Sequence, residues 1–250
     1  MELLKLENLC KSFGAIKVAD DVCLSLNQGE AVGIIGPNGA GKSSLFNLIG
    51  GNLRPDRGEL HYDGKRITHC SPQQRCHRGI GRTYQIPQPF SMMTVFENCL
   101  TASAFGKGIT EHHSYQHCAE VLERTGLVDK ANHLAGSLTL LERKRLEVAR
   151  ALSSSPHLLL LDEIAGGLTE NETGELVQLI RSIHASGTTV LWIEHVVNAL
   201  MAAVNRLIVI HFGAIILDGE PRAVMGSDEV KRIYLGIEGI GIGRNRTVGA

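Results

Sequence analysis

Hydrophobic and polar residues form short runs near the N-terminus that predict strands and one helix. Two runs of mixed polarity, at residues 3–9 and 22–26, predict an antiparallel β entry, because turn-forming residues follow each of them. A continuously apolar run at residues 31–35 predicts a buried strand, and helical spacing over residues 42–49 predicts a helix stopped by paired glycines. This region therefore predicts a strand, a glycine-rich loop and a helix in succession.

The middle of the chain is less regular and predicts a separate, partly helical lobe. A hairpin is expected at residues 59–68, turned by Asp63 and Gly64. Residues 86–110 contain two prolines and two glycines and are expected to be irregular, whereas residues 115–125 have helical character.

Strands and helices alternate in the C-terminal half. A helix is expected from Thr139 to about Ser153, and another near residues 172–185. The apolar runs that predict strands lie at residues 158–161, 188–193 and 206–210, with residues 214–217 as a hairpin partner for the last. Alternation of this kind favours a parallel sheet covered on both faces.

Composition narrows the class of protein without naming a partner. Of the 250 residues, 43% are hydrophobic, which indicates a globular chain. The net charge is -1, so the chain has no overall positive charge that would attract nucleic acid. No apolar run approaches the ~18 residues that a membrane span needs, and no secretory leader pattern is present. The six cysteines form no C-x-x-C pair and are interpreted as reduced thiols of a cytosolic protein.

The loop after the first buried strand fits the phosphate-loop pattern G-x-x-x-x-G-K-[ST]. Glycines let successive backbone N–H groups face a polyphosphate, the start of the helix adds a partial positive charge, and Lys42 adds a full one. Ser43 offers a hydroxyl to Mg²⁺. The alternative is a glycine turn that only links strand to helix. The predicted nucleotide-binding residues are Gly36, Pro37, Asn38, Gly39, Ala40, Gly41, Lys42, Ser43 and Ser44.

Two adjacent acids end the apolar strand at residues 158–161. Asp162 is expected to hold Mg²⁺ together with Ser43, and Glu163 to polarise a water for in-line attack on a γ-phosphorus. The alternative interpretation is that the two acids are ordinary solvated loop residues. The phosphate loop earlier in the chain favours the roles in metal binding and catalysis.

With these motifs in order, the chain resembles the nucleotide-binding subunit of an ATP-binding cassette (ABC) transporter over roughly residues 3–236. The resemblance implies that Phe13 stacks on adenine with Val18 beside the ribose. It also implies that Gln85 reaches Mg²⁺ and the attacking water, and that His195 contacts the γ-phosphate. Gln85, Glu163 and His195 are thus the expected catalytic residues, and Ser43, Gln85 and Asp162 the expected metal ligands.

The implied fold class is α/β: a phosphate-loop NTPase core with a mainly parallel sheet, an N-terminal antiparallel β subdomain and a small helical subdomain. Residues 1–236 are expected to form a single ABC ATPase domain that contains the helical subdomain at about 86–155. Residues 237–250 are expected to be a flexible C-terminal tail.

The segment that resembles the family's signature motif departs from it. The family pattern Leu-Ser-Gly-Gly-Gln becomes Leu138 followed by Thr139, Leu140, Leu141 and Glu142, so both glycines are missing. Thr139 and Glu142 still form a capping box, and a helix N-terminus there could present its N–H groups to an anion. The leucines restrict how closely a phosphate approaches the backbone. The loop after Glu163 also departs from the family pattern. Ile164 stands where proline is usual, and Thr169 stands where Asp or Asn is usual.

The resemblance implies an ATPase that uses ATP and Mg²⁺ and energises an importer. Each nucleotide would lie between Lys42 of one subunit and Thr139 of another, in a homodimer or in a heterodimer with a paralogous ATPase subunit. Integral membrane permease subunits and, indirectly, a solute-binding protein are the expected partners, with no nucleic acid. The chain would be cytoplasmic and peripheral on the inner face of the cell membrane. Three stretches, at residues 79–85, 192–196 and 229–236, are most similar to ATPases of branched-chain amino-acid importers.

Other functions stay open. They are a soluble ABC-type ATPase outside transport, a different phosphate-loop enzyme such as a small kinase or GTPase, and a nucleotide-binding module with weak turnover. The apolar side chains of residues 87–96 could line a groove for a partner's helix or form core beneath a loop. The basic residues of 143–150 alternate with acids and are interpreted as a salt-bridged helix face and not as a nucleic-acid patch.

Overall fold

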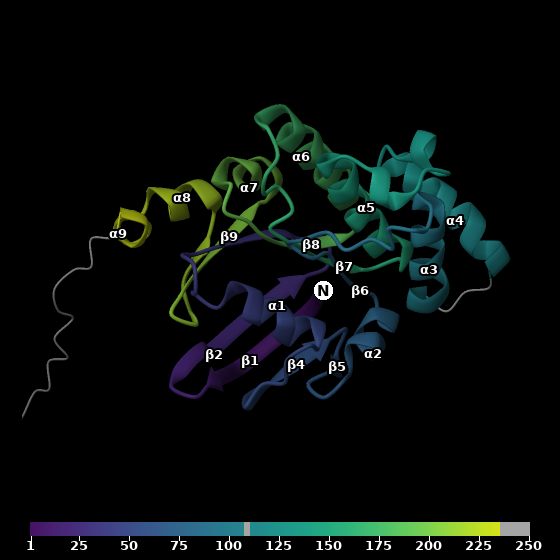
Figure 1. The fold of residues 1–250 in the computed structure, drawn as a ribbon. Coiled ribbons are helices and arrows are strands. Elements are labelled where there is room, and N and C mark those ends of the chain that lie inside the picture. Colours follow the sequence, from purple (N-terminus) through teal and green to yellow (C-terminus); the bar gives the residue numbers. More distant parts are fainter. Residues whose placement is uncertain (108–110, 236–250) are drawn as a thin grey trace, which may run out of the picture.

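The computed structural model describes residues 1–107 and 111–235 (Figure 1). The tail predicted at 237–250 lies outside the described residues. Two sheets lie one above the other, helix α1 (Lys42–Gly50) packs between them, and most of the other helices cover the far face of the larger sheet or its edge. This arrangement is the expected α/β class with an antiparallel subdomain and a helical group.

The smaller sheet is antiparallel and has the strand order β2-β1-β4-β5. Its strands are β1 (Glu2–Phe13), β2 (Ile16–Asn27), β4 (Arg57–Tyr62) and β5 (Lys65–Arg66). Phe13 pairs with Ile16 across a tight turn at Gly14, so the first hairpin extends further than residues 3–9 and 22–26. Buried leucines of β1, such as Leu4 and Leu6, face α1 and the larger sheet.

The larger sheet has the strand order β10-β9-β3-β8-β7-β6 and is parallel except for its edge strand β10. Every residue of β3, β7 and β8 is buried, because both faces of this sheet are covered, and that is why these strands are continuous apolar runs in the sequence. Its strands are β3 (Ala31–Ile35), β6 (Ile80–Arg82), β7 (Leu158–Asp162), β8 (Thr189–Ile193), β9 (Arg206–His211) and β10 (Ala214–Gly219).

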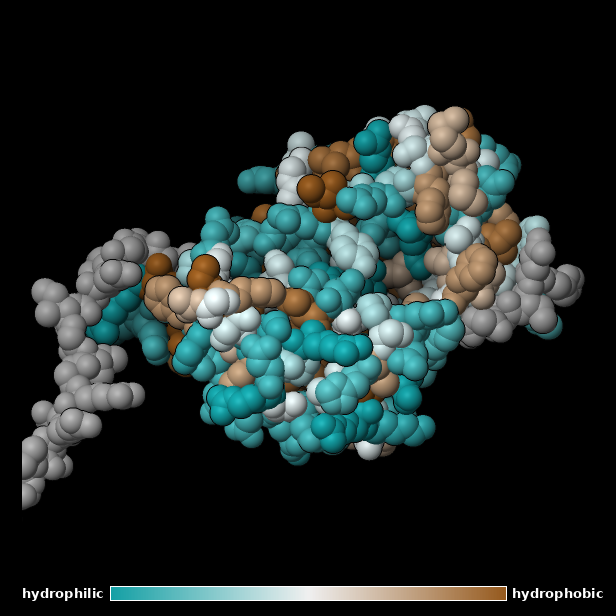
Figure 2. Space-filling view, turned by 60° about the horizontal axis from the view of Figure 1, so that its bottom comes forward, coloured by the Kyte–Doolittle hydropathy of each residue, from teal (hydrophilic) through white to brown (hydrophobic). Residues whose placement is uncertain are grey.

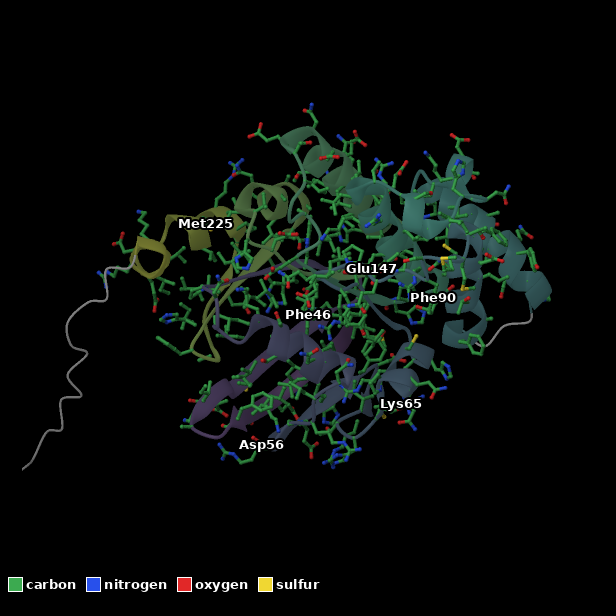
Figure 3. The ribbon with its side chains drawn as sticks, in the orientation of Figure 1. Phe46, Asp56, Lys65, Phe90, Glu147 and Met225 are labelled. Carbon is green, nitrogen blue, oxygen red and sulfur yellow. The ribbon has the colours of Figure 1, made fainter. Side chains whose placement is uncertain are left out.

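Hydrophobic side chains form a core on each face of the larger sheet. Phe46 of α1 is fully buried in the core between the two sheets, and its position is labelled in Figure 3. Trp192 of β8 is fully buried in the other core, among the helices. The remaining helices are α2 (Pro72–His77), α3 (Val95–Lys107), α4 (Glu111–Arg124), α5 (Leu140–Ser153), α6 (Glu170–Ala185), α7 (Val197–Ala203), α8 (Pro221–Gly226) and α9 (Asp228–Leu235), with single 3-10 turns at Val128–Lys130 and Ala135–Ser137.

The prediction that residues 86–110 are irregular holds for residues 86–94 and is wrong for residues 95–107, which form α3. Thr94 and Glu97 form a T-x-x-E capping box: the Thr94 N–H donates to the Glu97 carboxylate at 2.7 Å, and the Glu97 N–H donates to the Thr94 hydroxyl at 3.1 Å. The prolines that suggested a loop come before this box. Helix α4 likewise begins earlier than residue 115, at Glu111.

Helices α3, α4 and α5 pack against one another beside the β6 edge of the larger sheet (Figure 1). They lie within the residues predicted to form the helical subdomain, whose boundaries at 86–155 stay a prediction. Thr139 caps α5 through the predicted box with Glu142.

A single buried arginine fixes the end of α1. The Arg75 guanidinium is 1% exposed and donates to the carbonyl oxygens of five residues, which are Leu48, Ile49, Ile67, Thr68 and Cys70. Burial lowers the pKa of Arg75 to about 10, so it stays charged at neutral pH. The helix that follows the phosphate loop is therefore tied at its far end to the β4–β5 hairpin and to α2.

Candidate functional site

The phosphate loop passes close to the backbone of two other segments. Gly41 caps α1 with a φ of 105°, and a Cβ at this position would collide with the carbonyl oxygen of Val18. A Cβ at Gly36 would collide with the carbonyl oxygen of Ile210. No side chain caps α1, so the N–H groups of its first turn keep their capacity to bind an anion.

Lys42 is buried beside this loop. Its Nζ donates to the carbonyl oxygens of Gly36 at 2.7 Å and Pro37 at 3.0 Å, and the residue is 5% exposed. Burial lowers the pKa of Lys42, and the nearby carboxylates of Glu163 and Asp162 oppose that shift. The predicted cation and the two predicted acids are therefore close enough to interact electrostatically.

Asp162 is the last residue of β7 and is buried. Its carboxylate accepts a hydrogen bond from Arg82 at 3.0 Å, and the residue is 5% exposed. Burial raises the pKa of Asp162, while Arg82 acts to lower it. A second guanidinium nitrogen of Arg82 donates to the Asn47 side chain at 2.7 Å, which connects the acid to α1. Ser43 is exposed at the start of that helix.

Two of the three predicted catalytic side chains, Gln85 and His195, contact the carboxylate of the third, Glu163. Glu163 Oε1 lies 2.7 Å from His195 Nε2, and Glu163 Oε2 accepts from Gln85 Nε2 at 2.5 Å. Glu163 has a φ of 48°, which is uncommon for a residue with a side chain. Its own N–H donates to the Ile193 carbonyl at 2.9 Å, so the pairing of β7 with β8 continues to this residue.

The tip of the first hairpin adjoins the phosphate loop. Val18 contributes the carbonyl oxygen that faces Gly41. Phe13, at the end of β1, is 51% exposed, with the Lys11 ammonium 5.5 Å from its ring centroid. An aromatic ring with this exposure has area available for stacking on a base.

Residues 139–142 form the N-terminal cap of α5, in which Thr139 and Glu142 hydrogen-bond to each other. The Thr139 N–H donates to the Glu142 carboxylate at 2.9 Å, and the Glu142 N–H donates to the Thr139 hydroxyl at 3.4 Å. The Thr139 hydrogen bonds are the main cause that lowers the pKa of Glu142, which Lys130 also approaches at 3.3 Å. Leu140 is 44% exposed and packs against Gly167 of the loop after Glu163. Within the described parts of the chain, no hydrogen bond or ion pair joins this segment to the phosphate loop.

Comparison with known proteins identifies the family. The family model described as ABC transporter matches residues 19–166, which is more than half of the chain. The lipopolysaccharide export system ATP-binding protein LptB of Haemophilus influenzae is 35% identical over 236 residues, covering 94% of this chain and 98% of the relative. The high-affinity branched-chain amino acid transport ATP-binding protein LivG of Escherichia coli K12 is 34% identical over 249 residues, with the same two coverages.

This chain belongs to the ABC transporter family. The ADP conformation of MJ1267, an ATP-binding cassette of an ABC transporter, is 34% identical with a TM-score of 0.87, covering 94% of this chain and 99% of that one. The dimeric structure of MJ0796, a bacterial ABC transporter cassette, is 26% identical with a TM-score of 0.79, covering 88% of this chain and 99% of that one. The chain is an ATP-binding cassette whose ATPase activity energises transport.

Three charged residues of the cassette contact its predicted site, although the sequence did not suggest those contacts. Arg82 binds Asp162, and Glu194 accepts the N–H groups of Ala165 and His195. Lys144 is 3% exposed and donates to the Gln85 carbonyl, so it is buried against the loop that carries Gln85. A signal was available for Glu194, because a single acid follows the apolar run of β8 directly and a strand buried on both faces leaves its last side chain little solvent.

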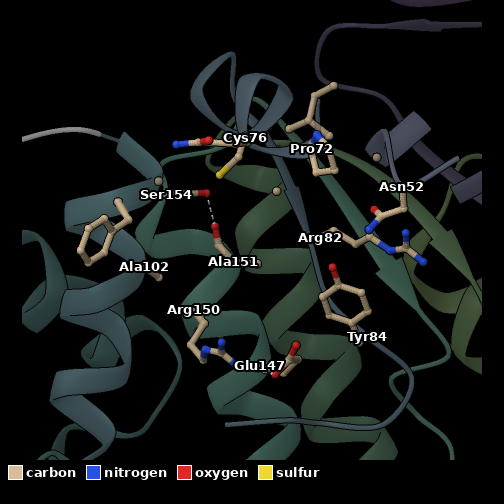
Figure 4. Close-up of a pocket in the computed structure, with 16 residues that line it drawn as sticks. Asn52, Pro72, Cys76, Arg82, Tyr84, Ala102, Glu147, Arg150, Ala151 and Ser154 are labelled. Atoms are coloured by element: carbon tan, nitrogen blue, oxygen red, sulfur yellow. Dashed lines mark hydrogen bonds and ion pairs between the residues drawn. The ribbon is translucent and has the colours of Figure 1, made fainter. Parts of the chain in front are cut away.

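A groove runs along the cassette where the sheet edge meets α2, α3 and α5 (Figure 4). It has a volume of about 380 Å³, and the side chains of Arg82, Tyr84, Phe105, Glu147 and Arg150 are among those that line it. The apolar residues of 87–96 are absent from the lining of this groove. Phe96 instead packs against the core beneath the loop, and Phe90 lies over the Arg150 guanidinium at 5.1 Å.

Large exposed apolar side chains are spread over the cassette. Figure 2 shows a mostly hydrophilic face on which hydrophobic residues form separate patches. Among the helices that the structure describes, none combines the length and the apolar character needed to cross a membrane.

We expect Lys42→Met to raise the melting temperature of the nucleotide-free cassette while abolishing the increase caused by ATP. Burial disfavours the Lys42 ammonium, and methionine removes that charge while keeping most of the side-chain volume. Because the pKa of Lys42 is lowered in the folded state, the unfolded chain binds more protons as the pH approaches 10.5, and wild-type stability rises in that window. The difference in melting temperature between variant and wild type should therefore shrink from pH 7.5 towards pH 10.5.

Thermal melts monitored by circular dichroism, with and without ATP, check this expectation. Lys65→Met, at an exposed residue of β5, is the matched control for loss of a lysine charge. A Lys42→Met cassette that ATP still stabilises would contradict the assignment.

Proposed function

We propose that the cassette hydrolyses ATP with Glu163 as the general base. The observation that supports this most directly is the pair of hydrogen bonds that Gln85 and His195 make to the two oxygens of that carboxylate. A water beside Glu163 would lose its proton to the carboxylate as its oxygen attacks the γ-phosphorus. The bond between that phosphorus and the β,γ-bridging oxygen then breaks, which releases ADP and phosphate.

The surrounding residues bind the polyphosphate and orient the attack. The phosphate loop and Lys42 hold the β- and γ-phosphates, and Phe13 stacks on the adenine with Val18 beside the ribose. His195 contacts the γ-phosphate and holds the base through the same imidazole. Lys42 would then exchange its hydrogen bonds to the Gly36 and Pro37 carbonyls for phosphate oxygens.

The donor set beside the loop suits Mg²⁺. Ser43 offers a hydroxyl, Asp162 a carboxylate and Gln85 an amide oxygen, since its amide nitrogen is the atom that faces Glu163. Hard oxygen ligands of this kind are those that Mg²⁺ prefers. When bound, the ion would neutralise part of the charge of the phosphates. Burial raises the pKa of Asp162, and the Arg82 guanidinium opposes that rise and so favours the ionised carboxylate.

The site is completed by a second cassette. Among the described residues, no hydrogen bond or ion pair joins the Thr139 segment to the phosphate loop of its own chain, and we propose that it faces the nucleotide of a head-to-tail partner. The partner is a second copy or a paralogous cassette. Its arrival would bring the N-terminus of an α5 helix towards the γ-phosphate.

The variant Glu163→Gln should form an ATP-dependent dimer that persists, because nucleotide binds and the base is lost. Light scattering with ATP and Mg²⁺ is expected to give twice the mass of the monomer, and wild type should return to the monomer as ATP is consumed. Glu229→Gln, at an exposed residue of α9, is the control. If the Glu163→Gln cassette keeps the mass of a monomer in the presence of ATP, both alone and with a paralogous cassette, the proposed site between two cassettes is wrong.

Restoring glycines at the start of α5 should accelerate hydrolysis in the homodimer. Leu140 and Leu141 place side chains where a phosphate would approach the backbone, and glycine removes them. We expect Leu140→Gly/Leu141→Gly to raise kcat by about tenfold, equivalent to one regained contact of about 1.4 kcal/mol. Leu140→Ala/Leu141→Ala keeps both Cβ atoms and should gain less. Equal phosphate release by wild type and the glycine variant would show that the leucines impose no barrier.

We also propose that the cassette serves an importer of branched-chain or other small amino acids. Support comes from several LivG and BraF relatives at 33–34% identity, although the export protein LptB is equally similar at 35%. The groove between the sheet edge and α5 is where a cytoplasmic helix of a permease would dock, because apolar Phe105 and the charges of Glu147 and Arg150 lie together there. The cassette would then act at the inner face of the cell membrane, with a solute-binding protein as an indirect partner.

The transported class can be tested with the cassette and its permease reconstituted in proteoliposomes. Phosphate release should increase when a leucine-loaded solute-binding protein is added on the opposite side, and the unloaded protein should stimulate less. The Glu163→Gln complex should release no phosphate in either case. Stimulation by lipopolysaccharide with no binding protein present would instead assign the cassette to export.

A further inference from the structure

Two buried charges next to the site, Glu194 and Lys144, have no part in the hydrolysis proposed above. They are 1% and 3% exposed, respectively. Isolated buried charges are costly, so each is expected to be held by specific partners. Those partners are the loops that carry Gln85, Glu163 and His195.

Glu194 joins the loop after β7 to the loop after β8. One carboxylate oxygen accepts the Ala165 N–H at 2.6 Å, and the other accepts the His195 N–H at 3.1 Å. Ala165 is two residues beyond the proposed base, and His195 is the residue that binds the base. The carboxylate therefore sets the spacing of two loops that both contribute to the catalytic arrangement.

The backbone of Glu163 needs such support. Its φ of 48° lies in the left-handed region, which a residue with a side chain adopts only when its surroundings impose it. On one side, the Glu163 N–H donates to the Ile193 carbonyl at 2.9 Å. On the other side, the hydrogen bond from Ala165 to Glu194 fixes the turn that follows.

Lys144 joins helix α5 to the Gln85 loop. Its Nζ donates to the Gln85 carbonyl at 2.8 Å. Burial lowers the pKa of the ammonium, and the carboxylates of Glu194, Glu147 and Glu163 oppose that shift, Glu194 most among them. Lys144 lies five residues after Thr139 on the same helix, so a displacement of the start of α5 also displaces the group that holds Gln85.

We propose that Glu194 and Lys144 form a pair of positioning residues that hold Gln85, Glu163 and His195 in the hydrolytic arrangement and transmit movements of α5 to it. This rests on the proposed function, because it assumes that Glu163 is the base. Neither residue touches the nucleotide or the water. Together they link the helix that begins with the Thr139 segment to the loops around the base, all within one chain.

The variant Glu194→Gln tests the first half of the pair. Glutamine has nearly the same shape but offers a single accepting oxygen, so one of the two N–H groups loses its partner. In the full cassette with its partner subunit, we expect kcat to fall by at least about tenfold while KM and the affinity for ADP change by less than about twofold. Glu220→Gln is the matched control, because Glu220 accepts the Ala223 N–H at 2.8 Å as the cap of α8, away from the site.

Variants of Lys144 test the second half and stay informative if Glu194→Gln does not fold. Lys144→Met should lower kcat with little change in KM, and Lys144→Arg, which keeps the charge and a donor, should recover most of the rate. If the two residues act as a unit, the double variant should be no slower than the slower single variant. Multiplied losses in the double variant, or a methionine variant as fast as wild type, would overturn the proposal.

A merely structural role predicts a different result. Loss of melting temperature and of ADP affinity, with kcat per folded molecule unchanged, would overturn positioning. The outcome for Glu163→Gln separates this proposal from the proposed function. If Glu163→Gln retains turnover, the proposed base is wrong, whereas an inactive Glu163→Gln beside a fully active Glu194→Gln defeats the positioning role alone.

Discussion

Parallel pairing of the buried strands β3, β8 and β7 is the constraint on which the site depends. Parallel strands end at the same edge of a sheet, so the phosphate loop, the acids after β7 and the histidine after β8 come from distant parts of the sequence to one edge. The Glu163 N–H to Ile193 carbonyl bond extends this pairing to the proposed base. A change in register between β7 and β8 would therefore separate Glu163 from His195 while leaving every motif intact in the sequence.

The same edge concentrates charge in a place with little water. Lys42, Asp162, Lys144 and Glu194 are each no more than 5% exposed, and burial shifts the pKa of every one of them towards its neutral form. Hydrogen bonds from Arg82 and from backbone N–H groups compensate the acids. Such a site holds its dipoles in place before the substrate arrives, which is the condition for electrostatic stabilisation of a developing charge.

Features of this fold whose signal lies in neighbouring residues can be predicted from the sequence, whereas those that depend on packing cannot. The phosphate loop, the apolar strands and the capping box of Thr139 each depend on residues that are neighbours in the sequence, and the structure contains all three. Helix α3 is not predicted although Thr94 and Glu97 form the same kind of box, because the two prolines before it favour a loop. The burial of Lys144 could not be predicted from the alternating charges of α5, since it depends on how that helix meets the Gln85 loop. The roles of the site residues stay predictions, and what the structure adds is that Gln85, Glu163 and His195 lie together.

The buried Arg75 also limits where the cassette can bend. Its guanidinium is shared by carbonyl groups from the end of α1 and from the segment after β5, so these parts cannot slide past one another without leaving several acceptors unpaired in the interior. The phosphate-loop helix and the antiparallel sheet are thereby joined into a stiff base. Helices α3, α4 and α5 are not held by this guanidinium, so their position relative to the stiff base depends on their packing against the larger sheet and α2.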